Sequence, residues 1–341
     1  MENGHIVSAK INNLGRIKKF ECDSFSNINL IIGENGSGKT FLLKALYSAI
    51  KSLEDYKRGD DIRNISEILS EKLRWTYQAE KLGDIVTKNA EAPYSFFFSV
   101  GNDTFEYQFS KDAITKVVNL SEPIKRNDCN SIFIPAKEVL SLYSIILKSR
   151  EVDRSFGFDD TYYDLAKALR VSPTRGRNYT AFAESRIKLQ NIVNGKVDLD
   201  ENTNRWYYKE GNYKYAIGTT SEGIKKIALL DRLLANGYLG RKSVIFIDEL
   251  ESALHPTAIS DFIDMLYYIS SEMDIQIFIA SHSYFVIKKL CLVALENKKS
   301  IKCISMNSND ININDLADGM PNNSIIDESI RLYEEEVEQV L

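Results

Sequence analysis

The stretch 30–40 constrains the fold of this chain more than any other. It runs L-I-I-G-E-N-G-S-G-K-T and fits the pattern G-x-x-x-x-G-K-[ST] at Gly33, Gly38, Lys39 and Thr40. Glycines allow a bend in which successive N–H groups point at phosphate oxygens, and a helix that starts there adds its positive end. An apolar strand pattern precedes the bend and an apolar helical pattern follows it. The sequence therefore predicts a nucleotide-binding loop, rather than an ordinary glycine turn.

Two side chains of this loop have distinct expected tasks. Lys39 would place a positive charge on the β- and γ-phosphates, and Thr40 would offer a hydroxyl ligand to Mg²⁺. The cofactors predicted are therefore ATP and Mg²⁺. The residues of this stretch predicted to contact them are Gly33, Glu34, Asn35, Gly36, Ser37, Gly38, Lys39, Thr40 and Phe41.

An acidic pair follows a second buried strand. The segment 243–247 contains the apolar run V-I-F-I and is followed by Asp248 and Glu249. Such runs are typical of strands buried on both faces of a parallel sheet, where ligands bind at the carboxyl ends. Asp248 would hold Mg²⁺, and Glu249 would polarise the attacking water. The alternative is a solvated strand end, which the upstream phosphate loop makes less favoured.

Two further segments repeat this logic. The apolar run 275–280 ends in Ser281-His282-Ser283, and His282 could bond a γ-phosphate, although a lone histidine is more often structural. Upstream, Ser221 is a natural N-cap for an apolar helix, and with Glu222 and Gly223 it would form a second anion-binding helix start. On its chemistry alone, a plain capped helix is the better explanation of this second segment.

Composition excludes several classes of protein. The chain has 341 residues, 44% hydrophobic and 27% charged, with a net charge of -5, which argues against a protein that coats nucleic acid. Its four cysteines form no C-x-x-C pair, so we expect reduced thiols rather than zinc or disulfides. The sequence shows neither a secretory signal nor an apolar run long enough for a membrane span, which predicts a cytoplasmic protein.

Periodicity predicts an α/β chain with insertions in one fold. Predicted strands are 6–11, 16–25, 28–32, 95–100, 104–109, 115–120, 131–134, 205–208, 213–217, 243–247 and 275–280. Predicted helices are 40–57, 62–82, 139–171 with a break at 155–160, 182–193, the helix that Ser221 opens, and an amphipathic helix at 324–341. This last helix could pack on the ATPase core or receive a partner, and we expect packing. The predicted units are 1–60 and 211–341 as the two parts of an ATPase core, and 61–130 and 131–210 as insertions.

The motif order G-E-N-G-S-G-K-T, T-S-E-G-I-K-K, V-I-F-I-D-E-L-E-S-A-L-H-P and I-A-S-H-S resembles the ABC-type ATPases. Within that class it is similar to the RecF and OLD-like branch, which includes ATPase subunits of anti-phage systems such as Septu and PARIS. The resemblance implies an ABC-ATPase head, that is, a P-loop NTPase fold with a mixed sheet core, an N-terminal antiparallel β region and a helical insertion. It implies Walker A roles for Lys39 and Thr40, signature roles for Ser221, Glu222 and Gly223, Walker B roles for Asp248 and Glu249, a D-loop at 251–256, a switch role for His282, and a place near the nucleotide base for the turn that ends at Arg16.

The chain departs from this class in three ways. Its signature is S-E-G-I-K-K instead of L-S-G-G-Q, and Gln108 is the one weak candidate for a Q-loop. It has no long heptad arm, which disfavours a coiled-coil repair machine. It leaves little room after the ATPase motifs for the Toprim nuclease domain of many OLD proteins.

The resemblance further implies composite sites, in which one copy's signature caps ATP held by another copy's loop. The leading hypothesis is a head-to-tail ATP dimer, or a larger oligomer, that controls a separate effector such as a nuclease in anti-phage defence. The alternative is a RecF-like repair ATPase that contacts DNA through Arg170, Arg175 and Arg177. A transporter subunit and a non-catalytic structural role are the least favoured.

Overall fold

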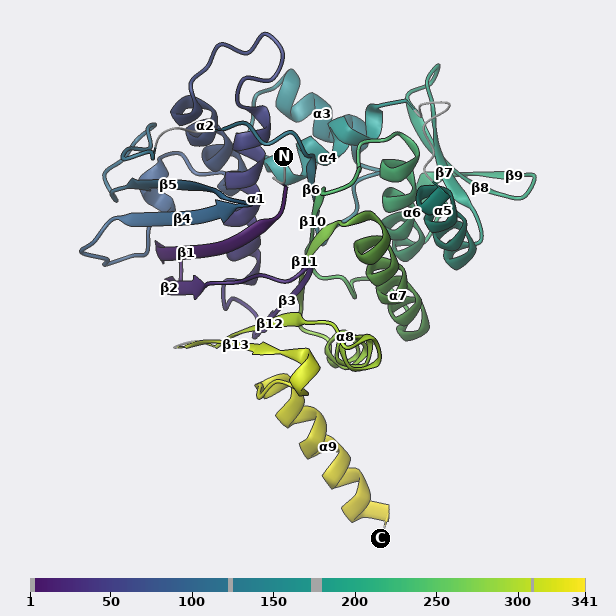
Figure 1. Cartoon of the computed structure of the whole chain (residues 1–341). Helices are drawn as coiled ribbons and strands as arrows, with labels where there is room; N and C mark the ends of the chain where they lie inside the picture. The colour runs from purple at the N-terminus through teal and green to yellow at the C-terminus, as the bar shows by residue number, and fades with distance from the viewer. Residues whose placement is uncertain (1–3, 122–124, 173–179, 308–309, 341) are drawn as a thin grey trace.

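The computed structural model describes residues 4–121, 125–172, 180–307 and 310–340 (Figure 1). At its centre lies a mixed sheet with the strand order β13-β12-β3-β11-β10-β6. Its strands are β3 (Ile28–Gly33), β6 (Ser131–Ile134), β10 (Val244–Ile247), β11 (Gln276–Ser281), β12 (Ile301–Met306) and β13 (Ile311–Asp315). All neighbours run parallel except β13, which is antiparallel to β12. Every residue of β3, β6, β10 and β11 is buried, which explains their continuous apolar runs.

The parallel arrangement brings four chemically active segments to one edge. The loop after β3, the segment after β6, the acidic residues after β10 and Ser281-His282 after β11 all follow carboxyl ends of neighbouring strands. In open α/β sheets this edge binds ligands. The predicted α/β fold with a mixed core is therefore confirmed, and it places the candidate residues together.

An antiparallel sheet covers one face of this core. Its order is β2-β1-β4-β5, with β1 (Ile6–Leu14), β2 (Ile17–Cys22), β4 (Tyr94–Val100) and β5 (Asp103–Phe109). The helix α1 (Lys39–Asp55) lies between the two sheets, where its residues from Leu42 to Leu53 are almost all buried (Figure 1). The sequence predicted this N-terminal antiparallel region, and the first helix starts directly from the phosphate loop.

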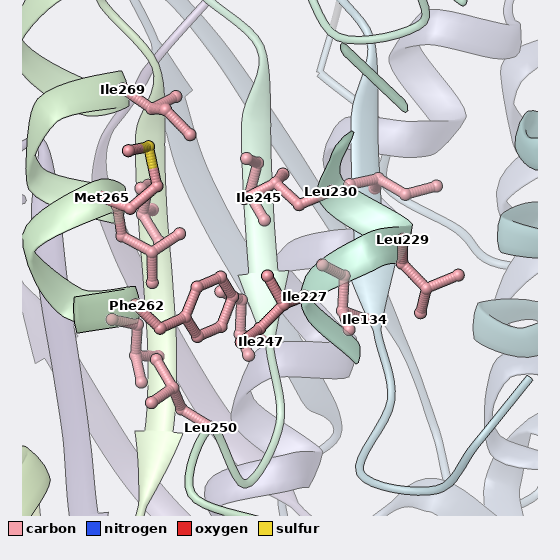
Figure 2. Packing of buried hydrophobic residues seen from close by; sticks show 14 of the residues in the cluster. Ile134, Ile227, Leu229, Leu230, Ile245, Ile247, Leu250, Phe262, Met265 and Ile269 are labelled. Atoms are coloured by element: carbon pink, nitrogen blue, oxygen red, sulfur yellow. The ribbon is translucent and has the colours of Figure 1, made fainter. Parts of the chain in front are cut away.

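Helices cover the opposite face of the core. In Figure 2, Ile245 and Ile247 of β10 lie between two helices, with Phe262 and Met265 on one side and Ile227 on the other. These helices are α6 (Glu222–Ala235) and α7 (Pro256–Met273). The remaining helices are α2 (Ile65–Tyr77), α3 (Tyr143–Glu151), α4 (Asp160–Arg170), α5 (Thr180–Val193), α8 (Tyr284–Asn297) and α9 (Ser324–Val340). β10, the strand that precedes Asp248 and Glu249, thus lies between the two helices α6 and α7. Their packing fixes the position of its carboxyl end.

Ion pairs and hydrogen bonds join the helical insertion to α1 and α2. Lys44 of α1 lies 2.6 Å from Asp159, and the hydroxyl of Tyr47 donates to Asp164 at 2.8 Å. Lys72 of α2 contacts Asp160 and Asp164 at 2.9 and 2.8 Å. The insertion therefore supports the helix that starts at the phosphate loop.

Several boundaries differ from the sequence expectation. Residues 115–120 do not form a strand, because Val118 makes only an isolated bridge with Gln108. The second strand ends at Cys22, and Phe25 beyond it turns inward to pack edge-on against Phe278. A small sheet, β7-β8-β9, gains an unexpected first strand; its strands are β7 (Lys196–Asp200), β8 (Arg205–Glu210) and β9 (Tyr213–Ala216). The helix predicted at 62–82 is shorter, since Asn64 caps it and Gln78 ends it with a left-handed backbone.

The terminal helix forms as predicted but does not pack on the body along its length. Ile326 in its first turn is buried, whereas the residues 330–339 are exposed. Figure 1 shows α9 projecting away from the rest of the molecule. The expectation that it packs on the ATPase core is therefore wrong beyond that first turn. None of the helices in the described ranges is long and apolar enough to cross a bilayer.

Candidate nucleotide-binding site

The loop 33–40, called here the phosphate loop, needs its glycines for both backbone angle and space. Gly33, Gly36 and Gly38 have φ values of +150°, +77° and +106°, which side chains disfavour. A Cβ atom on Gly33 would lie 2.2 Å from the carbonyl oxygen of Met306. The loop therefore runs tightly against β12 before α1 begins at Lys39.

Lys39 is held inside this loop. Its Nζ donates to the carbonyl oxygens of Gly33 and Glu34 at 2.7 and 2.9 Å, and its side chain is buried. Burial lowers the pKa of this ammonium, and the charges of Asp248 and Glu249 partly oppose that shift. A buried cation at a helix start, ringed by backbone groups, fits the phosphate chain of a nucleotide.

Thr40 meets the acidic pair (Asp248 and Glu249) across the sheet edge. Its Oγ1 donates to Oδ2 and Oδ1 of Asp248 at 3.0 and 3.1 Å. Burial raises the pKa of the Asp248 carboxyl. The described residues contain no cluster of three or more His, Cys, Asp or Glu side chains arranged for a metal. One hydroxyl and one carboxylate still fit Mg²⁺, which completes its shell with water and phosphate oxygens.

The backbone of the acidic pair is bent and anchored. Glu249 has a left-handed backbone φ of +47°, which is uncommon for residues other than glycine. The Nζ of Lys226 on α6 donates to the carbonyl oxygen of Asp248 at 3.1 Å and to that of Glu249. Burial lowers the pKa of Lys226 to about 8. This lysine therefore fixes the turn from which both carboxylates project.

His282 lies beside a carboxylate that orients it. Glu251 accepts from the backbone N–H of His282 and from the Ser281 hydroxyl, each at 2.9 Å. The Nδ1 of His282 is also 3.2 Å from Glu251, while the histidine side chain is 48% exposed. The imidazole is thus held at the sheet edge with its other side open.

A cavity of about 450 Å³ opens next to the phosphate loop. Arg16, on the turn between β1 and β2, donates to the carbonyl oxygen of Gly36 at 3.2 Å and lines this cavity. The Ser37 hydroxyl is shielded from solvent and has no hydrogen-bond partner among the described residues, as expected of a group that meets a ligand. Phe41 packs against the same turn, since a Cβ on Gly15 would lie 2.8 Å from its ring. The turn that the resemblance placed near a nucleotide base thus borders the phosphate loop and this cavity.

The helix start at Ser221, Glu222 and Gly223, called here the signature turn, is built differently. The Ser221 hydroxyl accepts from the Ile224 N–H at 3.4 Å, and Ser221 and Glu222 are exposed. Gly223 is buried so closely that a Cβ would lie 2.7 Å from the carbonyl oxygen of Ala253. Across the described ranges, no hydrogen bond or ion pair joins these three residues to the phosphate loop. The structure thus gathers the loop, the acidic pair and His282, but not the signature turn.

A protein-family model described as "AAA domain, putative AbiEii toxin, Type IV TA system" matches residues 28–288, well over half of the chain. The chain belongs to this family. The match begins at β3 and ends in α8, so it encloses the phosphate loop, the signature turn, the acidic pair and His282. This AAA family membership and the sheet order identify an ABC-type P-loop ATPase fold.

Three solved structures are similar to this chain at low sequence identity. A crystal structure of an SMC head bound to the C-winged helix domain of ScpA covers 91% of this chain and 97% of its own, with 14% identity and a TM-score of 0.51. An SMC head domain from Thermotoga maritima is 14% identical, covers 91% and 98%, and has a TM-score of 0.47. The recombination mediator RecF with ATP is 14% identical, covers 92% and 98%, and also scores 0.47. Only the first supports a comparison of fold, and a search of curated proteins found no match.

The sequence motifs of this AAA-family chain did not reveal all the residues that position the site. Lys226 occupies a buried position of α6 where the helical period predicts an apolar side chain, and that mismatch was the available signal. Glu251 was assigned to the D-loop without its partner His282. Glu138 follows β6, which pairs with β10, so its segment borders the acidic pair. Gln108 lies within β5 of the antiparallel sheet, and its backbone bonds Val118, so a Q-loop role has no support.

Proposed function

We propose that this protein is a Mg²⁺-dependent ATPase that acts as a nucleotide-gated dimeric switch and controls a separate effector in anti-phage defence. Family membership supports the ATPase core, and the geometry of the sheet edge supports the catalytic assignment. The switch, the effector and the defence role are the parts that experiments must test.

The hydrogen bond between Thr40 and Asp248 carries the proposal. These residues are 208 positions apart, yet the hydroxyl and the carboxylate meet at 3.0 Å where the phosphate loop ends. The hydroxyl at a helix start and the carboxylate at a strand end form a pair of oxygen ligands, and the ammonium of Lys39 lies in the same loop. That combination suits a metal-bound triphosphate better than any neutral ligand.

Glu249 is the proposed general base. It follows Asp248 directly, and the left-handed turn held by Lys226 fixes the direction of its side chain. A carboxylate in that place accepts a proton from a water aligned with the terminal phosphate. His282, anchored by Glu251, would donate a hydrogen bond to that phosphate and register its presence.

The exposed signature turn supports dimerisation. Ser221 and Glu222 at the start of α6 are exposed, and among the described residues this end makes no hydrogen bond or ion pair with the phosphate loop. A second copy could present this helix start to the phosphate held by the first, which would add positive charge where it is needed. Loss of the terminal phosphate would remove that contact and open the pair.

Glu249→Gln tests the catalytic proposal. ATP affinity should be retained, while turnover falls by about 100-fold or more because the base is neutral. The variant should therefore accumulate the ATP-bound head-to-tail form, measured as the increase in mass that ATP causes in light scattering after gel filtration. Glu80→Gln, an exposed carboxylate between α2 and β4, is the matched control. Unchanged turnover in Glu249→Gln would remove Glu249 from this role.

One observation supports a link to a second protein in a defence system. The family description names a putative toxin of a type IV toxin–antitoxin system. Expression of the chain with its native operon, followed by purification with and without ATP, should recover a stoichiometric partner. A chain that purifies alone under both conditions contradicts this part of the proposal.

The DNA-repair alternative depends on the cations near the end of α4. Arg170 is exposed, but Arg175 and Arg177 lie outside the described residues, so the structure adds nothing to their proposed cluster. Duplex binding that requires ATP and weakens steeply with salt would favour this alternative. Absence of such binding leaves the effector-control proposal in place.

A further inference from the structure

The part of α9 beyond its first turn presents an apolar stripe that no described residue covers. Ile330, Tyr333 and Val337 are 50%, 67% and 36% exposed. Their spacings of three and four residues place them on one helix face. Ile326, one turn earlier, continues the stripe onto the body and anchors the helix there. The stripe is thus held in place and available for contact.

Acidic side chains flank this stripe. If its residues occupy the a and d positions of a heptad, Asp327 and Glu334 fall at e and Glu336 at g. Arg331 is already paired within the helix, to Glu328 at 2.7 Å and to Glu335. Two α9 helices pairing with each other would bring these carboxylates together, which is unfavourable. The surface that receives α9 should therefore be apolar and positively charged.

The helix α8 offers such a surface on the same chain. Phe285, Leu292 and Leu295 are 58%, 42% and 48% exposed, and their spacing places them on its outer face. Lys288 lies between them along that face and is exposed, as are Lys298 and Lys299 just beyond the helix end. Glu296 is also exposed on this face, so the three lysines leave it with a net positive charge. At 1.5 Å per residue, this stripe spans about 15 Å, against about 10 Å for the stripe of α9. The α8 surface is therefore long enough to receive the stripe of α9, and the two surfaces share apolar character and carry opposite net charge.

These two surfaces are not joined within one molecule. The first turn of α9 is fixed to the body through Ile326, and from there the helix runs away from its own α8 (Figure 1). We propose that α9 of one copy docks on α8 of a second copy, apolar stripe against apolar stripe, with the acids of α9 facing the lysines of α8. By two-fold symmetry, the second copy's α9 docks on the first copy's α8.

This contact is separate from the proposed ATP-dependent one. None of its residues belongs to the phosphate loop, the acidic pair or the signature turn. The nucleotide-free chain should therefore self-associate, and added salt should weaken that association because charges contribute to it. Its failure would leave the ATPase proposal untouched, since turnover of Glu249→Gln is measured independently.

A matched pair of variants tests the stripe. Ile330→Glu and Leu332→Glu each add one negative charge to α9 at residues that are 50% and 52% exposed, but Leu332 lies off the stripe. In sedimentation equilibrium of the full nucleotide-free chain, Ile330→Glu should weaken self-association by at least about tenfold, and Leu332→Glu by less than about twofold. A wild-type chain that stays monomeric at all concentrations overturns the proposal, and so does equal loss in both variants.

A charge exchange tests the pairing of the two helices. Lys288→Glu with Lys299→Glu places like charges opposite α9, and Glu334→Lys with Glu336→Lys places like charges opposite α8. Each double variant alone should be monomeric, with the circular dichroism of the wild type. An equimolar mixture should associate again, since both contacts of the mixed pair then join opposite charges. A mixture that remains monomeric overturns the proposed pairing, and a partner protein binding the stripe of such a monomer would replace it.

Discussion

The phosphate loop and the signature turn are both helix starts, but the chain completes only one of them. In the phosphate loop, the buried Lys39 bonds backbone carbonyls of the loop itself, and Thr40 bonds Asp248 across the sheet edge. In the signature turn, Ser221 and Glu222 face solvent, although Gly223 behind them is packed against Ala253. The first end is therefore assembled to hold a ligand, whereas the second is rigid but open. This contrast supports the proposal that each chain supplies a binding half and that a second copy supplies the cap.

The largest effect is expected from a substitution in the phosphate loop, the half of the site that binds ATP. Lys39→Ala removes the buried ammonium, so ATP affinity measured by calorimetry should fall by at least about 100-fold. Lys196→Ala, which removes an exposed lysine at the start of β7, should leave the affinity unchanged. Thermal unfolding without nucleotide checks that the variant is folded. Full retention of affinity would reject the phosphate-loop assignment.

A second substitution disturbs the signature turn and leaves the phosphate loop unchanged. Gly223→Ala forces the start of α6 away from the Ala253 carbonyl, because the added Cβ would lie only 2.7 Å from it. ATP affinity of the monomer should stay within about threefold, while ATP-dependent dimerisation and turnover fall by about 100-fold. Light scattering and a phosphate-release assay measure the two effects. Equal loss of affinity and dimerisation would show that the two halves are not separable.

The smallest effect is expected at Lys226, which joins α6, the helix of the signature turn, to the acidic pair. Lys226→Met leaves two carbonyl groups of the acidic pair without their donor, so turnover should fall by about tenfold as the turn loosens. Lys289→Met is the control, because that partly buried lysine of α8 pairs with Asp264 instead, away from both halves. If both variants lose the same turnover, Lys226 has no special positioning role.

The same variant should also change how the free energy of unfolding depends on pH. Burial lowers the pKa of Lys226 from 10.5 to about 8, so between these values the folded state binds fewer protons than the unfolded chain. The contribution of Lys226 to the free energy of unfolding therefore rises with pH across that window. Chemical denaturation at pH 8 and pH 10 should show this rise in the wild type and a smaller one in Lys226→Met.

Sequence patterns predicted most of the fold because its buried strands and amphipathic helices are locally coded. The glycine pattern located the phosphate loop, and the apolar runs before Asp248 and before Ser281 located two more strand ends at the same edge. The predicted strand at 115–120 failed because an alternating pattern does not provide a partner, and Val118 meets only one residue of β5. The terminal helix was predicted from its stripe, but the stripe could not say which surface would cover it.

The sequence by itself determined which residues could bind phosphate and which segments would form strands and helices, since backbone angles and periodicity act over a few residues. Only the tertiary structure decided that Thr40 meets Asp248, that Glu251 holds His282 and that a buried Lys226 anchors the acidic pair. Those contacts join residues up to 208 positions apart, and the parallel order of the sheet brings them together. No local pattern encodes such an encounter, because it depends on how the strands are ordered across the whole core.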